Sequence, residues 1–221
     1  MKFGKIDYLN LLPFHVFMKR YLRYSQKQMS IRHNKNVPSK INALFEKRLI
    51  DAAFISSIKA KKYNHLGVGI VADNEVWSVL LLPSDQHIQD SASATSNILA
   101  KVLDLRGEVL IGDRALKLYN STDAKALDLA QEWHRRYGLP FVFALLCYHT
   151  DTQSIKKLSR AFVKSPKKIP HYLLQDAAKR SGVEQIVIKR YLTKISYRLD
   201  HRSLRSLKLF YRLAQQLKEQ S

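Results

Sequence analysis

The opening of this 221-residue chain repeats one pattern, in which a short apolar run ends at a polar residue and a helical pattern follows. The first run, Phe3–Leu9, ends at Asn10, and the second, Ile50–Ile55, ends at Ser56-Ser57. Strands that alternate with helices favour parallel pairing, because parallel neighbours need a crossover connection. The pattern therefore predicts an α/β fold with mainly parallel sheets flanked by helices.

Polar residues at strand ends are candidate ligand contacts, because open α/β sheets bind ligands beyond the carboxyl ends of their strands. Asn10 and the Ser56-Ser57 pair both occupy such places. An isolated Asn or Ser there is more often a turn residue or a helix cap. Two such termini on neighbouring strands are equally compatible with binding and with capping.

The middle of the chain adds further polar candidates. Ser78 interrupts the apolar strand Val76–Leu82, and Asp113 follows the strand Glu108–Gly112. Thr95 and Ser96 precede a helical pattern, where they can cap the helix or, with its backbone N–H groups, hold a carboxylate or phosphate. From residue 151 the chain reads as helical, and its last helix, 203–218, is basic and amphipathic. We interpret that helix as packing on the core rather than lying on a membrane.

The charge balance favours anionic partners, because 38 Lys and Arg residues against 18 Asp and Glu give a net charge of +20. Nucleic acid, acidic lipid and carboxylate or phosphate metabolites all remain compatible with it. The sequence has neither zinc-finger spacing nor an RNP-like aromatic motif. It also lacks an apolar run of about 18–20 residues. We expect a small anionic ligand, no nucleic-acid partner and no membrane partner.

Cysteine usage predicts a reducing compartment. Cys147 is the single cysteine, so no intramolecular disulfide can form. It lies in the apolar run Phe141–Leu146 and its continuation, and we interpret it as a buried core residue. The N-terminus shows no signal-peptide pattern, and we expect a cytoplasmic protein.

Known cofactor and catalytic motifs are missing from the sequence, which contains no GxGxxG, HExxH or GxSxG and no Cys/His cluster. We therefore expect neither a cofactor nor a metal. The remaining candidates are Asn, Ser, Thr and one Asp. Such a site would bind oxyanions through neutral hydrogen bonds and helix dipoles rather than through salt bridges.

Several segments together resemble a known family. Gly4–Asn10 (GKIDYLN), followed by Pro13-Phe14, resembles the N-terminal signature of the chorismate dehydratases of the futalosine route to menaquinone. Further matches follow in the family's order and span most of residues 3–146. They are Val37-Pro38 with Asn42, Asp51–Ser57 (DAAFISS), Val76–Leu82 (VWSVLLL), Ser93–Ser96 (SATS), Leu110–Leu116 (LIGDRAL) and Gly138–Ala144 (GLPFVFA).

The resemblance implies a two-lobed type II periplasmic-binding-protein-like fold with the substrate between the lobes. Residues 1–83 and 139–221 would form the first lobe, and residues 84–138 a smaller inserted lobe. Two departures from the family pattern stand out. Leu11 replaces a small hydroxyl residue, and the segment between Ser96 and Leu110 is short, which implies a trimmed second lobe.

The resemblance also implies an activity. Chorismate, a dianion, would lose water to give 3-[(1-carboxyvinyl)oxy]benzoate without a cofactor. Asn10 would lie at the reacting face, although a neutral amide is a poor general base. Asp113 is explained equally well as a helix cap. The expected substrate-binding residues are Tyr8, Ser56, Ser57, Ser78, Thr95, Ser96 and Asp113.

Three alternatives stay open at this point. The same fold could serve a non-catalytic protein that binds small carboxylate anions, or the related enzyme that acts on cyclic dehypoxanthinyl futalosine. The high positive charge also keeps a nucleic-acid binder as a third class. The sequence does not indicate the oligomeric state.

Overall fold

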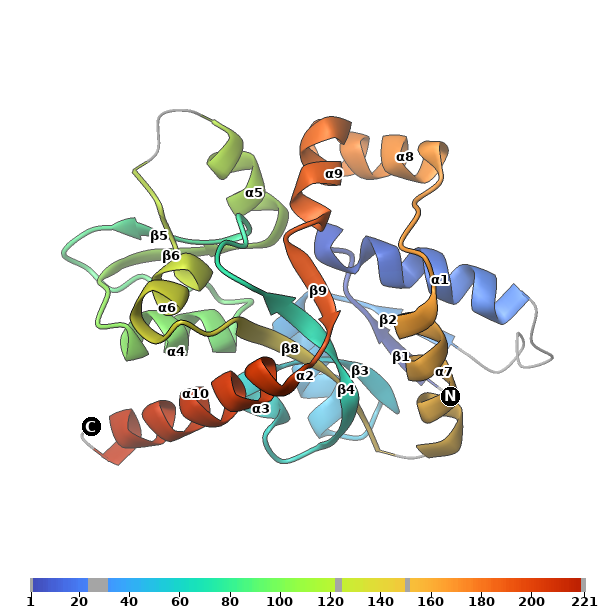
Figure 1. The fold of residues 1–221 in the computed structure, drawn as a ribbon, viewed down its shortest axis with the longest axis horizontal. Coiled ribbons are helices and arrows are strands. Elements are labelled where there is room, and N and C mark those ends of the chain that lie inside the picture. The colour runs from blue at the N-terminus through green and yellow to red at the C-terminus, as the bar shows by residue number, and fades with distance from the viewer. Residues whose placement is uncertain (1, 24–31, 122–124, 150–151, 220–221) are drawn as a thin grey trace.

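The computed structural model describes residues 2–23, 32–121, 125–149 and 152–219. Figure 1 shows two groups of elements, with the strands β4 and β8 running between them. The elements of the N-terminal part are β1 (Lys2–Lys5), the 3-10 helix η1 (Leu9–Leu11), α1 (Leu12–Arg23), β2 (Arg32–Lys35), α2 (Pro38–Glu46), β3 (Ala52–Ser56), α3 (Ser57–Ala60) and β4 (Asn64–Ala72). The central elements are β5 (Val79–Pro83), α4 (Ala94–Val102), β6 (Gly107–Ile111), α5 (Gly112–Asn120), β7 (Leu127–Asp128), α6 (Leu129–Tyr137) and β8 (Phe141–Tyr148). The C-terminal elements are α7 (Thr152–Lys164), α8 (His171–Ser181), α9 (Gln185–Leu192), β9 (Ile195–Arg198) and α10 (His201–Glu219).

Two sheets organise these elements. The larger has six strands in the order β2-β1-β3-β8-β4-β9, and the smaller has three in the order β6-β5-β7. In Figure 1 the smaller sheet lies at the left with α4, α5 and α6, while α1, α7, α8 and α9 lie at the right. The smaller sheet uses β5, residues 79–83, which the predicted lobe boundary places in the first lobe. The division into lobes stays a prediction.

The predicted mainly parallel sheets are wrong in one respect. Among the strands of the described residues, β1 alone pairs in parallel, with β2 and with β3, and one isolated parallel bridge joins Ile88 to Glu108. The β3–β8, β4–β8 and β4–β9 pairs are antiparallel, as are both pairs of the smaller sheet. The cause is the path of the chain, because β4 leads out of the larger sheet and β8 returns to it in the opposite direction. The repeated strand–helix pattern of the N-terminal part therefore predicts correctly only the parallel pairs that β1 makes with β2 and β3.

Local boundaries also differ from the sequence-based expectation. The first strand ends at Lys5, and Asn10 lies in the short helix η1 rather than at a strand end. The strand expected from Val76 begins at Val79, because Trp77 has a left-handed backbone with φ of 63°. Gly138, with φ of 65°, ends α6.

An aromatic cluster packs between the larger sheet and the helices α1 and α7. Phe14 on α1 packs edge-on against both Phe54 of β3 and Phe162 of α7, each with ring centroids 4.9 Å apart. Such edge-to-face pairs add to the free energy gained from burying the rings. Cys147 on β8 is fully buried, and burial raises the pKa of its thiol to about 12. Its interpretation as a core residue is confirmed.

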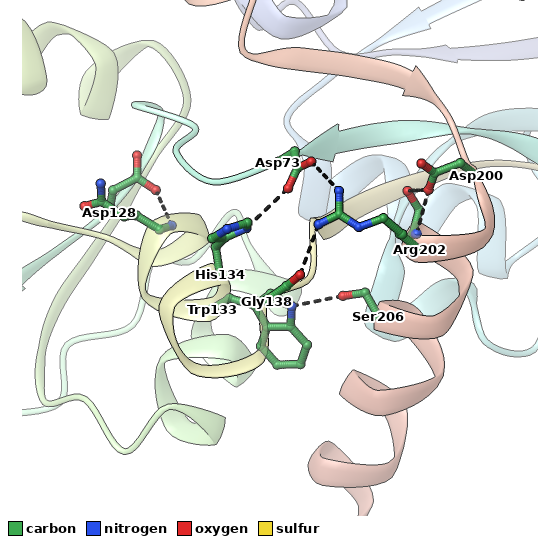
Figure 2. Close-up of polar contacts among 10 residues, drawn as sticks. Asp73, Asp128, Trp133, His134, Gly138, Asp200, Arg202 and Ser206 are labelled. Carbon is green, nitrogen blue, oxygen red and sulfur yellow. Dashed lines mark hydrogen bonds and ion pairs between the residues drawn. The ribbon is translucent and has the colours of Figure 1, made fainter.

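The C-terminal helix α10 joins the two groups of elements. Figure 2 shows Arg202 beside Asp73 and the Gly138 carbonyl, and its guanidinium donates to them at 2.8 and 3.0 Å. The Trp133 indole of α6 donates to Ser206 Oγ at 2.9 Å. These contacts confirm that the basic amphipathic helix packs on the core. Within the described ranges, no helix is both long and apolar enough to cross a bilayer.

Asp128 fixes the connection between β4 and β5. One oxygen of its carboxylate accepts the N–H groups of Val76 and Trp77 at 2.8 and 2.6 Å. The other oxygen accepts those of Ala130 and Gln131 at the start of α6, at 2.9 and 3.2 Å. Burial raises the pKa of Asp128 to about 6 against the opposing effect of these four amides. The group is therefore ionised at neutral pH, and it holds the left-handed Trp77 in place.

Replacing Asp128 by Ala should lower the free energy of unfolding by about 3 kcal/mol, because buried N–H groups lose their acceptors. Urea unfolding followed by circular dichroism measures the change. Asp85 is exposed and forms no hydrogen bond or ion pair with the described residues, so Asp85→Ala is the matched control and should change stability by less than about 0.5 kcal/mol. Equal effects of the two substitutions would contradict the role given to Asp128.

Candidate functional site

A cleft of about 600 Å³, part of it open to solvent, lies where the two sheets face each other. Its apolar walls come from β3, β4 and β8 of the larger sheet, from β5 and β6 of the smaller sheet, and from connecting segments. Its polar groups come from η1, from the end of β3, from the β4–β5 connection and from the start of α4. The polar side chains that line it are Tyr8, Asn10, Ser56, Ser78, Ser93 and Ser96.

The polar groups of the cleft are neutral side chains and helix ends rather than charged side chains. Among the described residues that line it, none is Asp, Glu, Lys, Arg or His. Instead, Pro38, Ser93 and Gly112 line it at the N-terminal ends of α2, α4 and α5. The N-terminal end of a helix carries a partial positive charge and N–H groups that attract carboxylates and phosphates. Three such ends converge on one cleft.

Three serine hydroxyls of the cleft are oriented by neighbouring side chains. Each serine oxygen accepts a hydrogen bond from a neighbouring donor, so each keeps its own proton to donate to a ligand. The pairs, donor first, are Asn42 Nδ2 to Ser56 Oγ (2.9 Å), Tyr191 Oη to Ser78 Oγ (2.8 Å) and Ser93 Oγ to Ser96 Oγ (2.7 Å). The arrangement turns three ambivalent hydroxyls into hydrogen-bond donors, which suits the oxygens of carboxylates.

Asn10 adds a hydrogen-bond acceptor to these three donors. Its side-chain Oδ1 is buried and has no hydrogen-bond partner among the described residues. Its own carbonyl accepts from the Tyr197 hydroxyl at 2.5 Å, which anchors η1. A buried acceptor without a partner is costly, and such groups in a native protein call for an explanation. A ligand hydroxyl that donates to Asn10 Oδ1 would remove that cost.

Tyr8 covers one wall of the cleft and packs against Gly112. Burial, together with the charges of Asp90 and Asp113, raises the pKa of Tyr8 to about 12, so its phenol stays neutral. Gly112 has φ of 68°, and a Cβ placed there would lie 2.9 Å from the Tyr8 ring. Glycine is needed at this position for both reasons.

Three of the residues predicted for binding lie behind the cleft wall instead of lining it. Asp113 Oδ1 accepts the Leu9 N–H at 3.0 Å, and burial raises the pKa of its carboxyl. Ser57 Oγ lies 3.3 Å from Thr95 Oγ1, which also accepts the Ile58 N–H at 3.2 Å. These contacts tie neighbouring elements together. The structure brings the other four, Tyr8, Ser56, Ser78 and Ser96, to the cleft together with Asn10, which was predicted for the reacting face, and the roles of all five stay predictions.

Sequence reasoning missed the groups that orient these side chains. Ser93 and Asn42 stand within motifs that carry the family resemblance, so their positions offered a signal. Tyr191 stands at the start of a C-terminal segment, residues 191–210, that matches the family only loosely, and Tyr197 lies within it. No local pattern connects them to Ser78 and Asn10, which are more than 100 residues away. Tyr197 lies on the strand β9, in a region that the sequence pattern predicts to be helical.

Comparisons with known proteins agree with one another. A family model described as menaquinone biosynthesis matches residues 1–107 and 95–216. A Campylobacter jejuni protein named chorismate dehydratase is 41% identical over 220 residues, which cover 98% of this chain and 99% of that protein.

Solved structures agree on the fold. The crystal structure of an Archaeoglobus fulgidus protein superposes with a TM-score of 0.75 at 16% identity, covering 98% of this chain and 97% of that one. A Candida albicans protein described as having the generic periplasmic binding protein fold superposes with a TM-score of 0.58 at 12% identity, covering 97% and 90%. At these identities the likeness concerns the fold alone, and it confirms the fold that the resemblance implied.

The comparisons also bear on the shortened segment. The two ranges matched by the family model overlap at residues 95–107, which is the region that the sequence marks as short. The Campylobacter protein aligns along nearly its whole length with nearly the whole of this chain, so the two chains have nearly the same length.

Gly112→Ala should cost about 3 kcal/mol of unfolding free energy, because it adds both left-handed strain and a clash with Tyr8. Gly138→Ala is the matched control. Its φ is 65° and no atom lies within 4 Å of its Cβ position, so only the strain of about 1 kcal/mol applies. Urea unfolding of both variants measures the difference. Equal losses would mean that Tyr8 does not require the glycine.

Proposed function

We propose that this chain, which belongs to the menaquinone biosynthesis family, is a chorismate dehydratase that converts chorismate to 3-[(1-carboxyvinyl)oxy]benzoate and water. The observation that carries this proposal is the polarity of the cleft. Three serine hydroxyls are oriented to donate hydrogen bonds into the cleft. One buried amide oxygen, Asn10 Oδ1, has no donor among the described residues and can accept a hydrogen bond from a ligand. Chorismate offers two carboxylates and one hydroxyl, which match these groups in kind.

Substrate binding uses the neutral donors. Ser56, Ser78 and Ser96 donate to the carboxylate oxygens, and the N-terminal ends of α2, α4 and α5 add favourable partial charge. The net charge of +20 attracts the dianion over longer range and raises its rate of encounter. The apolar walls hold the ring and exclude water, which strengthens each of these hydrogen bonds.

The reaction is a 1,2-elimination of water, from C3 and C4 of the ring, driven by formation of an aromatic ring. The C3–H bond breaks, its electron pair enters the ring, and the C4–O bond breaks to release the hydroxyl as water with one proton. Asn10 Oδ1 accepts the hydrogen bond of the C4 hydroxyl and so orients it toward departure. The protein's task is mainly to position the substrate.

The proton acceptor on this proposal is a carboxylate of the substrate itself or a water that it holds. The lining residues of the cleft include no ordinary general base, and Tyr8 stays neutral because its pKa is about 12. Asp113 stands behind the wall and is engaged with Leu9. Asn10 is too weak a base to take the proton alone.

We place the enzyme in the cytoplasm as part of the same proposal. The support is its likeness to a biosynthetic enzyme and the single buried cysteine, which suits a reducing compartment. Chorismate is the one partner proposed.

The direct test is incubation of the purified protein with chorismate, with the benzoate product detected by its absorbance and mass. Thermal stabilisation by chorismate without turnover would favour the non-catalytic anion-binding alternative. Absence of both effects, with cyclic dehypoxanthinyl futalosine consumed instead, would favour the related enzyme.

Asn10→Ala should lower kcat by about 10²–10³-fold, the loss typical of one oriented polar group at a reacting centre. Its stability should be unchanged or higher, because the substitution removes a buried oxygen that has no partner in the free protein. Steady-state kinetics and urea unfolding measure the two effects. The exposed Asn64 is the control, and Asn64→Ala should leave both unchanged. A large loss of stability in Asn10→Ala would make Asn10 structural.

The kcat/KM for chorismate should be flat between about pH 6 and pH 9. Over this range the substrate carboxylates are ionised and the Tyr8 phenol is neutral, since burial raises its pKa to about 12. Initial rates in buffers of constant ionic strength measure the profile. A limb with an apparent pKa near 7 would instead reveal an acid or base supplied by the protein.

A further inference from the structure

Two buried tyrosines from the C-terminal part of the chain reach the back of the cleft. Tyr191 lies on α9 and donates to Ser78 Oγ at 2.8 Å. Tyr197 lies on β9 and donates to the carbonyl of Asn10 at 2.5 Å. Both tyrosines are more than nine-tenths buried, and neither lines the cleft. One segment of seven residues therefore supports two cleft groups that lie far apart in the sequence.

The contact of Tyr191 determines the polarity of Ser78. Among the described residues, Tyr191 is the sole hydrogen-bond partner of the Ser78 hydroxyl, and it acts as the donor. Because the serine oxygen is occupied as an acceptor, its own proton points elsewhere, and the cleft is where Ser78 is open. Burial raises the pKa of Tyr191, so the phenol keeps its proton throughout the physiological range.

The contact of Tyr197 holds the turn that carries Asn10. The short helix η1 has no side-chain cap, and its backbone is tied from two sides. Asp113 accepts the N–H of Leu9, and Tyr197 donates to the carbonyl of Asn10. A three-residue 3-10 helix has little stability of its own. The direction of the Asn10 amide thus depends on these two contacts.

The serine at 78 is also fixed through its backbone. The Gly112 N–H donates to the Ser78 carbonyl at 2.8 Å, and Asp128 holds the two preceding N–H groups. The backbone of Ser78 is therefore set independently of Tyr191. What the Tyr191 phenol adds is control of the hydroxyl proton.

We infer that Tyr191 and Tyr197 are positioning residues for the dehydration, in which Tyr191 directs the Ser78 proton toward a substrate carboxylate and Tyr197 holds Asn10 against the leaving hydroxyl. This inference rests on the proposed function. Neither tyrosine touches the substrate. Each acts through one named cleft residue, and this separates the inference from a general role of the two rings in core packing.

The test uses three Tyr→Phe variants, each of which removes one phenolic oxygen and keeps the ring. Tyr191→Phe should raise KM about tenfold with kcat changed less than threefold, because Ser78 binds the carboxylate in the ground state as well as in the transition state. Tyr197→Phe should lower kcat about tenfold with little change in KM. The matched control is Tyr211→Phe, whose phenol donates to the Ser57 carbonyl at 2.8 Å away from the cleft lining. It should leave both constants within twofold.

A double-mutant cycle with Ser78→Ala separates positioning from packing. If Tyr191 acts through Ser78, then adding Tyr191→Phe to Ser78→Ala should change KM by less than twofold. A tenfold rise in KM in both backgrounds would overturn the inference. So would wild-type kinetics for Tyr191→Phe and Tyr197→Phe, or losses equal to those of Tyr211→Phe.

The outcome is distinguishable from failure of the proposed function. If the unmodified protein does not convert chorismate, the proposed function fails before the variants are compared. If it does convert chorismate and the tyrosine variants match it, only the positioning role fails. Thermal unfolding of each variant shows whether the fold is intact, and the cycle is interpreted from variants whose melting temperatures agree within about 5 °C.

Discussion

The four hydrogen bonds accepted by the Asp128 carboxylate are the interactions on which the rest of the site depends. The carboxylate binds two amides of the β4–β5 connection and two at the start of α6. The connection would otherwise not keep Trp77 at a positive φ, which costs a non-glycine residue energy. With Trp77 held, the neighbouring residue Ser78 faces the cleft. One buried acid thus sets the geometry where the chain passes from the larger sheet to the smaller.

On the proposed function, the cleft of this strongly basic protein would bind a dianion without a salt bridge. Burying an Arg or Lys beside the ligand would require removing its water, which offsets much of the attraction. Neutral hydroxyls that are already oriented avoid this cost, and the helix N-terminal ends supply partial charge that is fixed in place. The net charge of +20 then acts at long range, on encounter rather than on the geometry of binding.

Several features followed from residue patterns alone. Strand–helix alternation in the N-terminal part predicts β1, β3 and their parallel pairing, because apolar runs and crossover helices are local signals. Polar residues after these runs predict Asn10 and Ser56 as cleft residues, and the structure places both in the cleft lining. Leu11, the departure from the family pattern beside Asn10, is buried and also lines the cleft.

The sequence by itself determined that Asn and Ser side chains would be among the polar groups of the cleft, the strand–helix order near the N-terminus and the family to which the chain belongs. Only the tertiary structure decided the antiparallel path of β4 and β8, the support of Ser78 and Asn10 by Tyr191 and Tyr197, and the withdrawal of Ser57, Thr95 and Asp113 behind the wall. The physical reason is the distance along the chain over which each effect acts. Propensity and periodicity act over a few residues, whereas these contacts join groups that meet only after the two sheets and the C-terminal segment have packed.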